Sequence, residues 1–136
     1  MKKIFVDTNV WLRFLVADDE KSFLLCQQFF KKVEEGKFRI YTSTIVLLEI
    51  IYTLTSFYKI DKKQVVEDIK NILSTRNLTL VEKTDFTKAL ELFSKLSIKM
   101  ADCMIATQLP KETALCTFDQ EFKKIKSIKS FEVGEI

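Results

Sequence analysis

The sequence predicts an α/β fold: a three-layer α/β/α sandwich with a central parallel sheet. Two features of its pattern support this. Short apolar runs such as Ile4–Val6 are typical of strands covered on both faces. Between these runs lie longer segments whose apolar residues recur at helical spacing. Strands that alternate with amphipathic helices are joined by right-handed crossovers, so a parallel sheet between two helical layers is expected.

The first half of the chain contains two expected strands and four expected helices. The first strand, Ile4–Val6, is followed by a helix that Asn9 can cap and that runs to about Ala17. Gly36 is expected to stop the next helix. This second helix covers about 19–35 and is followed by a strand over 38–42. Ser43 or Thr44 then begins an apolar helix over 45–58, and Asp61 caps the fourth helix.

The second half continues the alternation. Thr84 is expected to cap a helix with an apolar stripe, and Pro110 to follow the end of another. The expected elements are a strand over 78–81, helices over about 84–96 and 101–109, a strand over 114–118, a short helix over 119–125 and an edge strand over 130–133. No internal repeat or boundary interrupts them, so residues 1–136 are expected to form a single domain.

Composition agrees with one folded domain. Among 136 residues, 47% are apolar and only 2 are Gly and 1 is Pro, which leaves little material for linkers or disorder. No apolar run approaches the roughly 18 to 20 residues of a membrane span, and Met1 to Lys3 lead into a strand rather than a signal peptide. We therefore expect a soluble, cytoplasmic protein that makes no membrane contact.

The chain has no histidine, which excludes catalytic triads and the usual zinc hydrolases. Its cysteines, Cys26, Cys103 and Cys116, lack a CxxC spacing and lie among apolar residues, as reduced buried thiols do. The net charge of +3 is too small to indicate nucleic-acid binding by itself. Four lysines near the C-terminus fit a solvated helix face: Lys123, Lys124, Lys126 and Lys129.

Four acidic residues lie within or beside segments that are otherwise apolar: Asp7, Glu49, Asp102 and Asp119. Burying a carboxylate costs several kcal/mol unless a cation or hydrogen-bond donors meet it. Asp7 and Asp119 follow expected strands, whereas Glu49 and Asp102 lie in the first two turns of expected helices. Since these strand ends and helix starts share one edge of a parallel sheet, the four acids are expected to bound one pocket.

Each acid also has an ordinary explanation. Asp102 and Asp119 could be helix N-caps, Asp7 could close a turn, and Glu49 could pair with a basic residue such as Arg13. Glu49 fits its alternative least well, because it lies in a run of branched or long apolar residues. The joint occurrence of all four favours convergence.

Carboxylates without imidazole or thiolate are the ligand set that suits Mg²⁺ or Mn²⁺. Such an ion assists phosphodiester hydrolysis by activating water and by neutralising charge in the transition state. Four polar residues flank the acids and could orient them or contact substrate: Thr8, Asn9, Ser43 and Thr117. Capping and strand preference are the alternative for each of these.

Four segments together resemble those of the PIN-domain family, specifically the VapC-like toxin ribonucleases of VapBC toxin–antitoxin systems. They are Phe5-Val6-Asp7-Thr8-Asn9-Val10, Ser43-Thr44-Ile45-Val46-Leu47-Leu48-Glu49, Ala101-Asp102-Cys103-Met104-Ile105-Ala106 and Thr117-Phe118-Asp119-Gln120-Glu121-Phe122. The resemblance implies a PIN-like fold and a Mg²⁺- or Mn²⁺-dependent endoribonuclease, with Asp7, Glu49, Asp102 and Asp119 as metal-binding and catalytic residues.

The resemblance also implies a homodimer and an antitoxin whose C-terminal segment lies along a groove beside the acids. The helix over 45–58, with Trp11, Phe14 and Leu15, could supply either surface, and core packing is the alternative for each. One departure from the family pattern is the approach to Asp102, Ser97-Ile98-Lys99-Met100. It lacks the glycine or aromatic residue often found there, and Lys99 places a cation near the acids.

Other functions remain open on the sequence. A PIN-domain RNA-processing nuclease without an antitoxin would have the same acids, and a non-catalytic PIN-like module would have little reason to hold four carboxylates together. A receiver-like module would need an acceptor Asp after the third strand, where Glu82 and Lys83 stand. An aspartyl phosphatase usually has a second acid two residues after Asp7, where this chain has Asn9.

Overall fold

The computed structural model describes residues 1–136 and contains one five-stranded sheet. The strands are β1 (Lys2–Val6), β2 (Phe38–Ser43), β3 (Leu78–Val81), β4 (Thr113–Cys116) and β5 (Ser130–Phe131). Every neighbouring pair is parallel, and the strand order is β3-β2-β1-β4-β5. The predicted fold class is confirmed.

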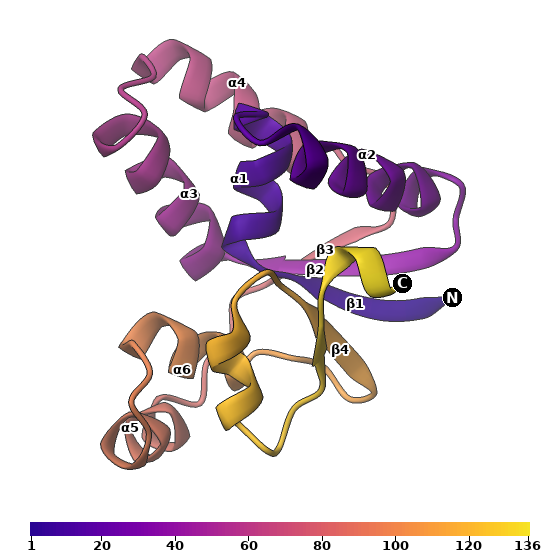
Figure 1. Cartoon of the computed structure of the whole chain (residues 1–136). Coiled ribbons are helices and arrows are strands. Elements are labelled where there is room, and N and C mark those ends of the chain that lie inside the picture. Colours follow the sequence, from indigo (N-terminus) through magenta and orange to yellow (C-terminus); the bar gives the residue numbers. More distant parts are fainter.

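Helices cover both faces of this sheet, as Figure 1 shows. They are α1 (Thr8–Val16), α2 (Glu20–Glu34), α3 (Thr44–Ser56), α4 (Lys62–Leu73), α5 (Phe86–Lys95) and α6 (Met100–Ala106). The first four lie on one side, and α5 and α6 pack together on the other (Figure 1). Two short 3₁₀ helices, η1 (Gln120–Lys124) and η2 (Val133–Glu135), complete the chain.

The central strand β1 has no water-facing side over most of its length. Ile4, Phe5 and Val6 are fully buried, and β2 and β4 flank the strand on either side. A strand covered on both faces needs a continuous apolar run, which explains why this segment has no polar alternation. The chain leaves this buried strand at Asp7, so the carboxylate enters an environment that is already largely dry.

The strand register brings the predicted acidic edge together. Val6 pairs with Cys116 in the ladder between β1 and β4, so the chain leaves both strands at the same level. Ser43 ends β2 and caps α3 by accepting a hydrogen bond from the amide of Val46 at 3.3 Å. The segments that follow β1, β2 and β4 therefore meet at one edge of the sheet.

Two predicted N-caps are wrong by one or two residues. Asp7, not Asn9, caps α1, and Asp85, not Thr84, caps α5 through the amide of Lys88. In both cases the nearby polar residue has a tertiary partner instead. Thr84 accepts a hydrogen bond from Gln108, and Asn9 reaches the turn after β4. The predicted caps Ser43 and Asp61 are confirmed.

Several boundaries near the C-terminus also differ from the prediction. Helix α6 ends at Ala106 rather than Leu109, and β4 ends at Cys116 rather than Phe118. Phe118 is in a turn because its amide donates to Asn9, not to a neighbouring strand. The short helix after Asp119 is a 3₁₀ helix, and β5 covers only two residues.

The apolar residues considered for partner surfaces divide between core and surface. Trp11 is only 2% exposed and stacks on Phe30 at 4.7 Å between ring centroids, so it belongs to the core. In contrast, α3 presents Leu48 and Tyr52 to solvent, 63% and 69% exposed. The three cysteines are free and buried, as predicted. None of the helices combines the length and apolar character that a membrane crossing needs.

Candidate active site

All four predicted acids line one small pocket at the carboxyl edge of the sheet. The pocket has a volume of about 160 Å³ and a single apolar lining residue, Leu12. Its other lining residues are polar or charged: Asp7, Thr8, Asn9, Glu49, Thr53, Lys99, Asp102 and Asp119. The four acids come from four separate segments of the chain, so the fold itself assembles the pocket.

Asp7 is the most firmly held of the acids. Its Oδ1 accepts from the amide of Thr8 at 2.8 Å, and its Oδ2 accepts from the hydroxyl of Thr117 at 2.7 Å. The carboxyl group is almost fully buried, and this burial raises its pKa to about 6 against the lowering effect of the two hydrogen bonds. Nearby Glu49 raises the pKa further, whereas Lys99 lowers it.

The hydroxyl of Thr117 joins Asp7 to two other parts of the site. Besides donating to Asp7, it accepts hydrogen bonds from Asn9 Nδ2 at 3.3 Å and from the amide of Asp119 at 2.9 Å. A hydroxyl has one proton and two acceptor positions, so Thr117 uses its full capacity. Asn9 completes the link, because its Oδ1 accepts from the amide of Phe118 at 3.0 Å.

Glu49 reaches the pocket from the second turn of α3. Its Oε1 accepts from the Thr8 hydroxyl at 2.8 Å, and its Oε2 lies 3.4 Å from Lys99 Nζ. The alternative that Glu49 pairs with a basic residue is confirmed, but its partner is Lys99 and not Arg13, which pairs with Asp18. Glu49 thus has both a hydroxyl donor and a cation, which explains how a lone acid can stand in an apolar helix.

Asp102 lies in the first turn of α6, but it does not cap that helix. The N-cap position belongs to Lys99, whose side chain makes no capping bond. The Asp102 side chain is only 5% exposed, and its Oδ1 lies 3.9 Å from Lys99 Nζ. Burial raises the pKa of Asp102 to about 7; Lys99 opposes this shift, while Asp7, Asp119 and Glu49 add to it.

Asp119 and Ser43 both cap helices, with different consequences for the site. Asp119 accepts from the amide of Glu121 at 2.9 Å, so its expected role as a cap is real, and it lines the pocket as well. Ser43 caps α3 and is fully buried outside the pocket lining. Its hydroxyl supports the helix that carries Glu49 and contacts none of the four acids.

Comparison with known proteins identifies the family of this chain. The family model described as PIN domain matches residues 4–128, nearly the whole chain. The chain belongs to the PIN-domain family. This PIN domain is 26% identical over 131 residues to a VapC ribonuclease of Aquifex aeolicus, covering 93% of this chain and 96% of that protein.

A solved structure shows the same fold. It is the crystal structure of VapBC2 from Rickettsia felis bound to a DNA fragment from their promoter. The match has a TM-score of 0.68 and 21% identity, and it covers 96% of this PIN domain and 98% of that chain. At this level of identity the likeness establishes the arrangement of the elements.

The donor set of the pocket fits a hard divalent cation. The lining of this PIN domain offers carboxylate, hydroxyl and amide oxygens, with no thiol or imidazole, and that set suits Mg²⁺ or Mn²⁺. Two of the carboxylates, Asp7 and Asp102, have raised pKa values, mainly because they are buried and to a smaller degree because other acids lie nearby. No group of three or more acidic side chains is gathered closely enough in this structure to hold an ion.

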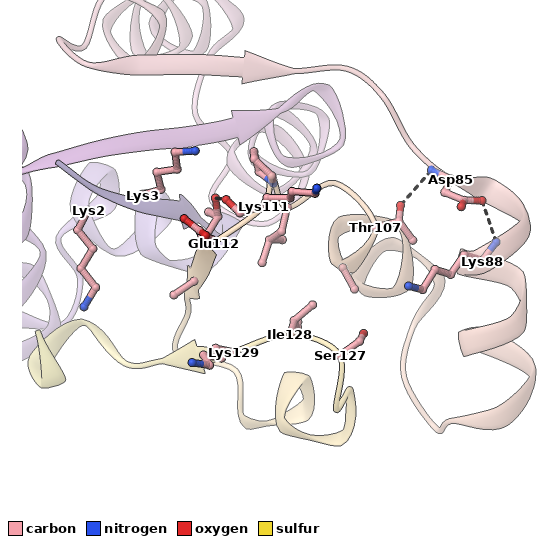
Figure 2. Close-up of a pocket in the computed structure, with 15 residues that line it drawn as sticks. Lys2, Lys3, Asp85, Lys88, Thr107, Lys111, Glu112, Ser127, Ile128 and Lys129 are labelled. Atoms are coloured by element: carbon pink, nitrogen blue, oxygen red, sulfur yellow. Dashed lines mark hydrogen bonds between the residues drawn. The ribbon is translucent and has the colours of Figure 1, made fainter.

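The largest hollow in this PIN domain lies at the other edge of the sheet. Figure 2 shows this hollow, which has a volume of about 690 Å³ and is lined at the amino ends of β1 and β4. Its lining includes five lysines, none of which is in an ion pair: Lys2, Lys3, Lys88, Lys111 and Lys129. One of its acids, Asp85, is committed to capping α5 (Figure 2). It offers no cluster of acids, so the smaller pocket is the candidate active site.

Three residues of the pocket were not among the predicted site residues: Leu12, Thr53 and Lys99. Thr53 lies one turn after Glu49 on α3, and the four-residue spacing could have indicated that both occupy the same face. Leu12 lies four residues after Thr8 on α1 and could have been found in the same way. Lys99 was expected only to lie near the acids, and the structure shows that it contacts two of them.

Proposed function

We propose that this PIN domain is a metal-dependent endoribonuclease, the toxin of a VapBC-type toxin–antitoxin pair. One observation carries the proposal: Asp7, Glu49, Asp102 and Asp119 line a single pocket although they are far apart in the sequence. The similarity to a VapC ribonuclease supports RNA as the substrate. The absence of histidine leaves carboxylates as the groups available for hydrolysis.

Asp7, Glu49, Asp102 and Asp119 would hold Mg²⁺ or Mn²⁺. When bound, such an ion supplies an activated water and positive charge beside the reacting phosphate. Thr117 and Thr8 fix the Asp7 carboxylate, and Thr8 also fixes one oxygen of Glu49. These contacts orient the acids before substrate arrives, which reduces the reorganisation required during the reaction.

Asn9 connects the two strand ends that carry Asp7 and Asp119. Its amide group bonds to Thr117 and to the backbone of Phe118, so it holds the turn after β4 against the start of α1. It also lines the pocket, in a position to meet substrate. We assign Asn9 to positioning the site and contacting RNA.

An antitoxin would find an apolar surface on α3, the helix that carries Glu49. A groove of about 470 Å³ between α3 and α4 is lined by residues that include Ile51, Val65 and Val66. Leu48 and Tyr52 are exposed on the helix that carries Glu49. A partner segment lying there could bury apolar area and block the pocket. The VapBC2 structure, a complex of this kind, supports such a partner.

A homodimer is also proposed. Helix α5 presents a stripe of apolar residues at helical spacing, Phe86, Leu90 and Phe93, each about half exposed. Burying that stripe against a second copy would remove it from water. Light scattering on the purified protein, with Leu90→Glu as the disruptive variant, tests this surface.

Cleavage of a panel of structured RNAs tests the proposed function. Wild-type protein should cleave with Mg²⁺ or Mn²⁺ and not with EDTA. Asp7→Asn and Asp102→Asn should each lower the cleavage rate by about 100-fold or more, because each removes a charged oxygen from the metal site. Asp61→Asn is the matched control, since Asn caps a helix as well as Asp and this cap is exposed on α4.

Two results would contradict the proposal. Cleavage that persists in EDTA would exclude the metal-dependent mechanism. Equal activity in Asp7→Asn, Asp102→Asn and Asp61→Asn would show that the pocket is not the active site. If the pocket is catalytic but no small protein co-purifies or inhibits it, an RNA-processing role without an antitoxin replaces the toxin assignment.

A further inference from the structure

The Lys99 ammonium lies against two of the four acids. It is 3.4 Å from Glu49 Oε2 and 3.9 Å from Asp102 Oδ1, and Lys99 is the only basic residue in the pocket lining. It therefore stands in the acidic pocket as a cation supplied by the chain itself.

Helix stability does not explain a lysine at this position. Lys99 occupies the N-cap of α6, where a side-chain acceptor would normally satisfy a free amide, and it makes no such bond. A positive charge is also unfavourable at the positive end of a helix dipole. The position of this charge is instead explained by its contacts with Glu49 and Asp102.

The base of Lys99 is fixed while its end can move. The carbonyl of Lys99 accepts from the amides of Asp102 and Cys103 at 3.1 and 3.2 Å. The side chain, however, is 63% exposed and carries its amine on a flexible four-carbon stem. The ammonium can leave the acids and turn toward solvent without any change in the backbone.

We propose that Lys99 is the resident cation of this pocket, which competes with the divalent ion for Glu49 and Asp102 and, once displaced, contacts an RNA phosphate at the pocket mouth. The proposal rests on the proposed nuclease function. It makes Lys99 a positioning residue with opposite effects on two ligands. Its charge opposes metal binding in the free protein and attracts the phosphate of the substrate.

A purely structural salt bridge would behave differently. If Lys99 served only to compensate the buried carboxylates, its loss would lower the melting temperature and leave metal affinity unchanged. A resident cation, in contrast, must be pushed away before a second cation can approach the same oxygens. Metal affinity therefore separates the two explanations without depending on activity.

Isothermal titration of Mn²⁺ into RNA-free protein is the deciding experiment, with wild type, Lys99→Met, Lys99→Arg and the control Lys95→Met. Lys95 is exposed at the end of α5 and is outside the pocket lining. Lys99→Met should bind Mn²⁺ about 5- to 20-fold more tightly, because one competing charge is gone. Lys99→Arg and Lys95→Met should stay near the wild-type affinity.

Steady-state cleavage at saturating Mn²⁺ tests the phosphate contact. Lys99→Met should raise KM for RNA about 5- to 10-fold and change kcat less than 3-fold, and Lys99→Arg should restore KM. Unchanged or weaker Mn²⁺ binding by Lys99→Met would overturn the resident-cation role, and an unchanged KM would overturn the phosphate contact. Tighter Mn²⁺ binding in a protein that cleaves no RNA would support the resident cation and reject the nuclease function.

Discussion

The two ends of β1 and β4 carry opposite charges and are built in different ways. At the carboxyl end, four acidic side chains surround about 160 Å³, and two of them, Asp7 and Asp102, are buried. At the amino end, five long lysines surround a hollow of about 690 Å³ without a single ion pair (Figure 2). The larger space therefore has fewer fixed contacts than the smaller one.

The difference follows from side-chain length and burial. Asp7 directly follows a buried strand, so its backbone is held by the core. Its short carboxylate is fixed by hydrogen bonds from Thr8 and Thr117. An exposed lysine side chain remains free to change rotamer, and salt screens the electrostatic effect of its charge. Substitutions at the acidic edge should therefore have large and specific effects, and those at the lysine edge small and salt-dependent ones.

Thr117→Val should produce the largest effect among changes that keep all four acids. It removes the hydroxyl that holds Asp7 and leaves the Asn9 amide and the Asp119 amide without their acceptor. We expect RNA cleavage to fall about 10- to 100-fold and unfolding to become easier by about 1–3 kcal/mol. Cleavage assays and urea unfolding measure the two quantities.

Thr117→Ser is the control for that substitution, because it keeps the hydroxyl. It should retain activity within about threefold of wild type. If the Val and Ser variants lose the same activity, the loss does not depend on the hydroxyl and its hydrogen bonds alone, and the contrast between the two edges fails.

The metal-free protein should become less stable as pH rises from about 4 to 7. Burial raises the pKa of Asp7 to about 6 and of Asp102 to about 7, so over this range the folded state binds more protons than the unfolded state. The stabilising contribution is fully present at lower pH and is lost once both groups ionise, at about 1.4 kcal/mol per pKa unit. Melting curves in EDTA at pH 4 and pH 8 measure it.

An Asp7→Asn/Asp102→Asn double variant should lack this part of the pH dependence. Mn²⁺ binding to wild type should show the reverse trend and strengthen over the same range, because the ligands must lose their protons. A wild-type melting curve whose pH dependence matches the double variant would show that these acids are solvated rather than desolvated.

The smallest effect is expected at the lysine edge. The triple variant Lys3→Gln, Lys111→Gln, Lys129→Gln should cleave RNA within about threefold of wild type at roughly 150 mM salt, since exposed charges are screened over about 8 Å there. The matched control removes three exposed lysines elsewhere: Lys21, Lys83 and Lys95. A tenfold loss confined to the first variant would make the hollow a substrate contact and overturn the comparison.

The sequence predicted the fold and the placement of all four acids in one pocket, because both depend on local patterns. Alternating strands and helices define the parallel sheet, and residues that follow such strands share an edge. The catalytic and metal-binding roles of the acids remain proposals. Their common location is a property of the structure.

What the sequence did not predict depends on contacts between distant residues. Asn9 was expected to cap α1, but it bonds to Thr117 and Phe118, more than 100 positions away. No local pattern specifies that choice. The hollow lined by lysines was missed for the same reason. Of the four lysines crowded near the C-terminus, only Lys129 lines it. The other four lysines of the hollow come from distant segments of the chain: Lys2, Lys3, Lys88 and Lys111.

The double hydrogen bond to Asp7 determines how the pocket can adapt. Rotation of that carboxylate would break its contact with Thr8 or Thr117, whereas the Asp102 side chain accepts no hydrogen bond and is held only by its ion pair with Lys99. Asp7 is thus held in one orientation, whereas the side chain of Asp102 is free to rotate. In the proposed metal site, movement of Asp102 alone would let the pocket fit divalent ions of different radius while Asp7 stays in place.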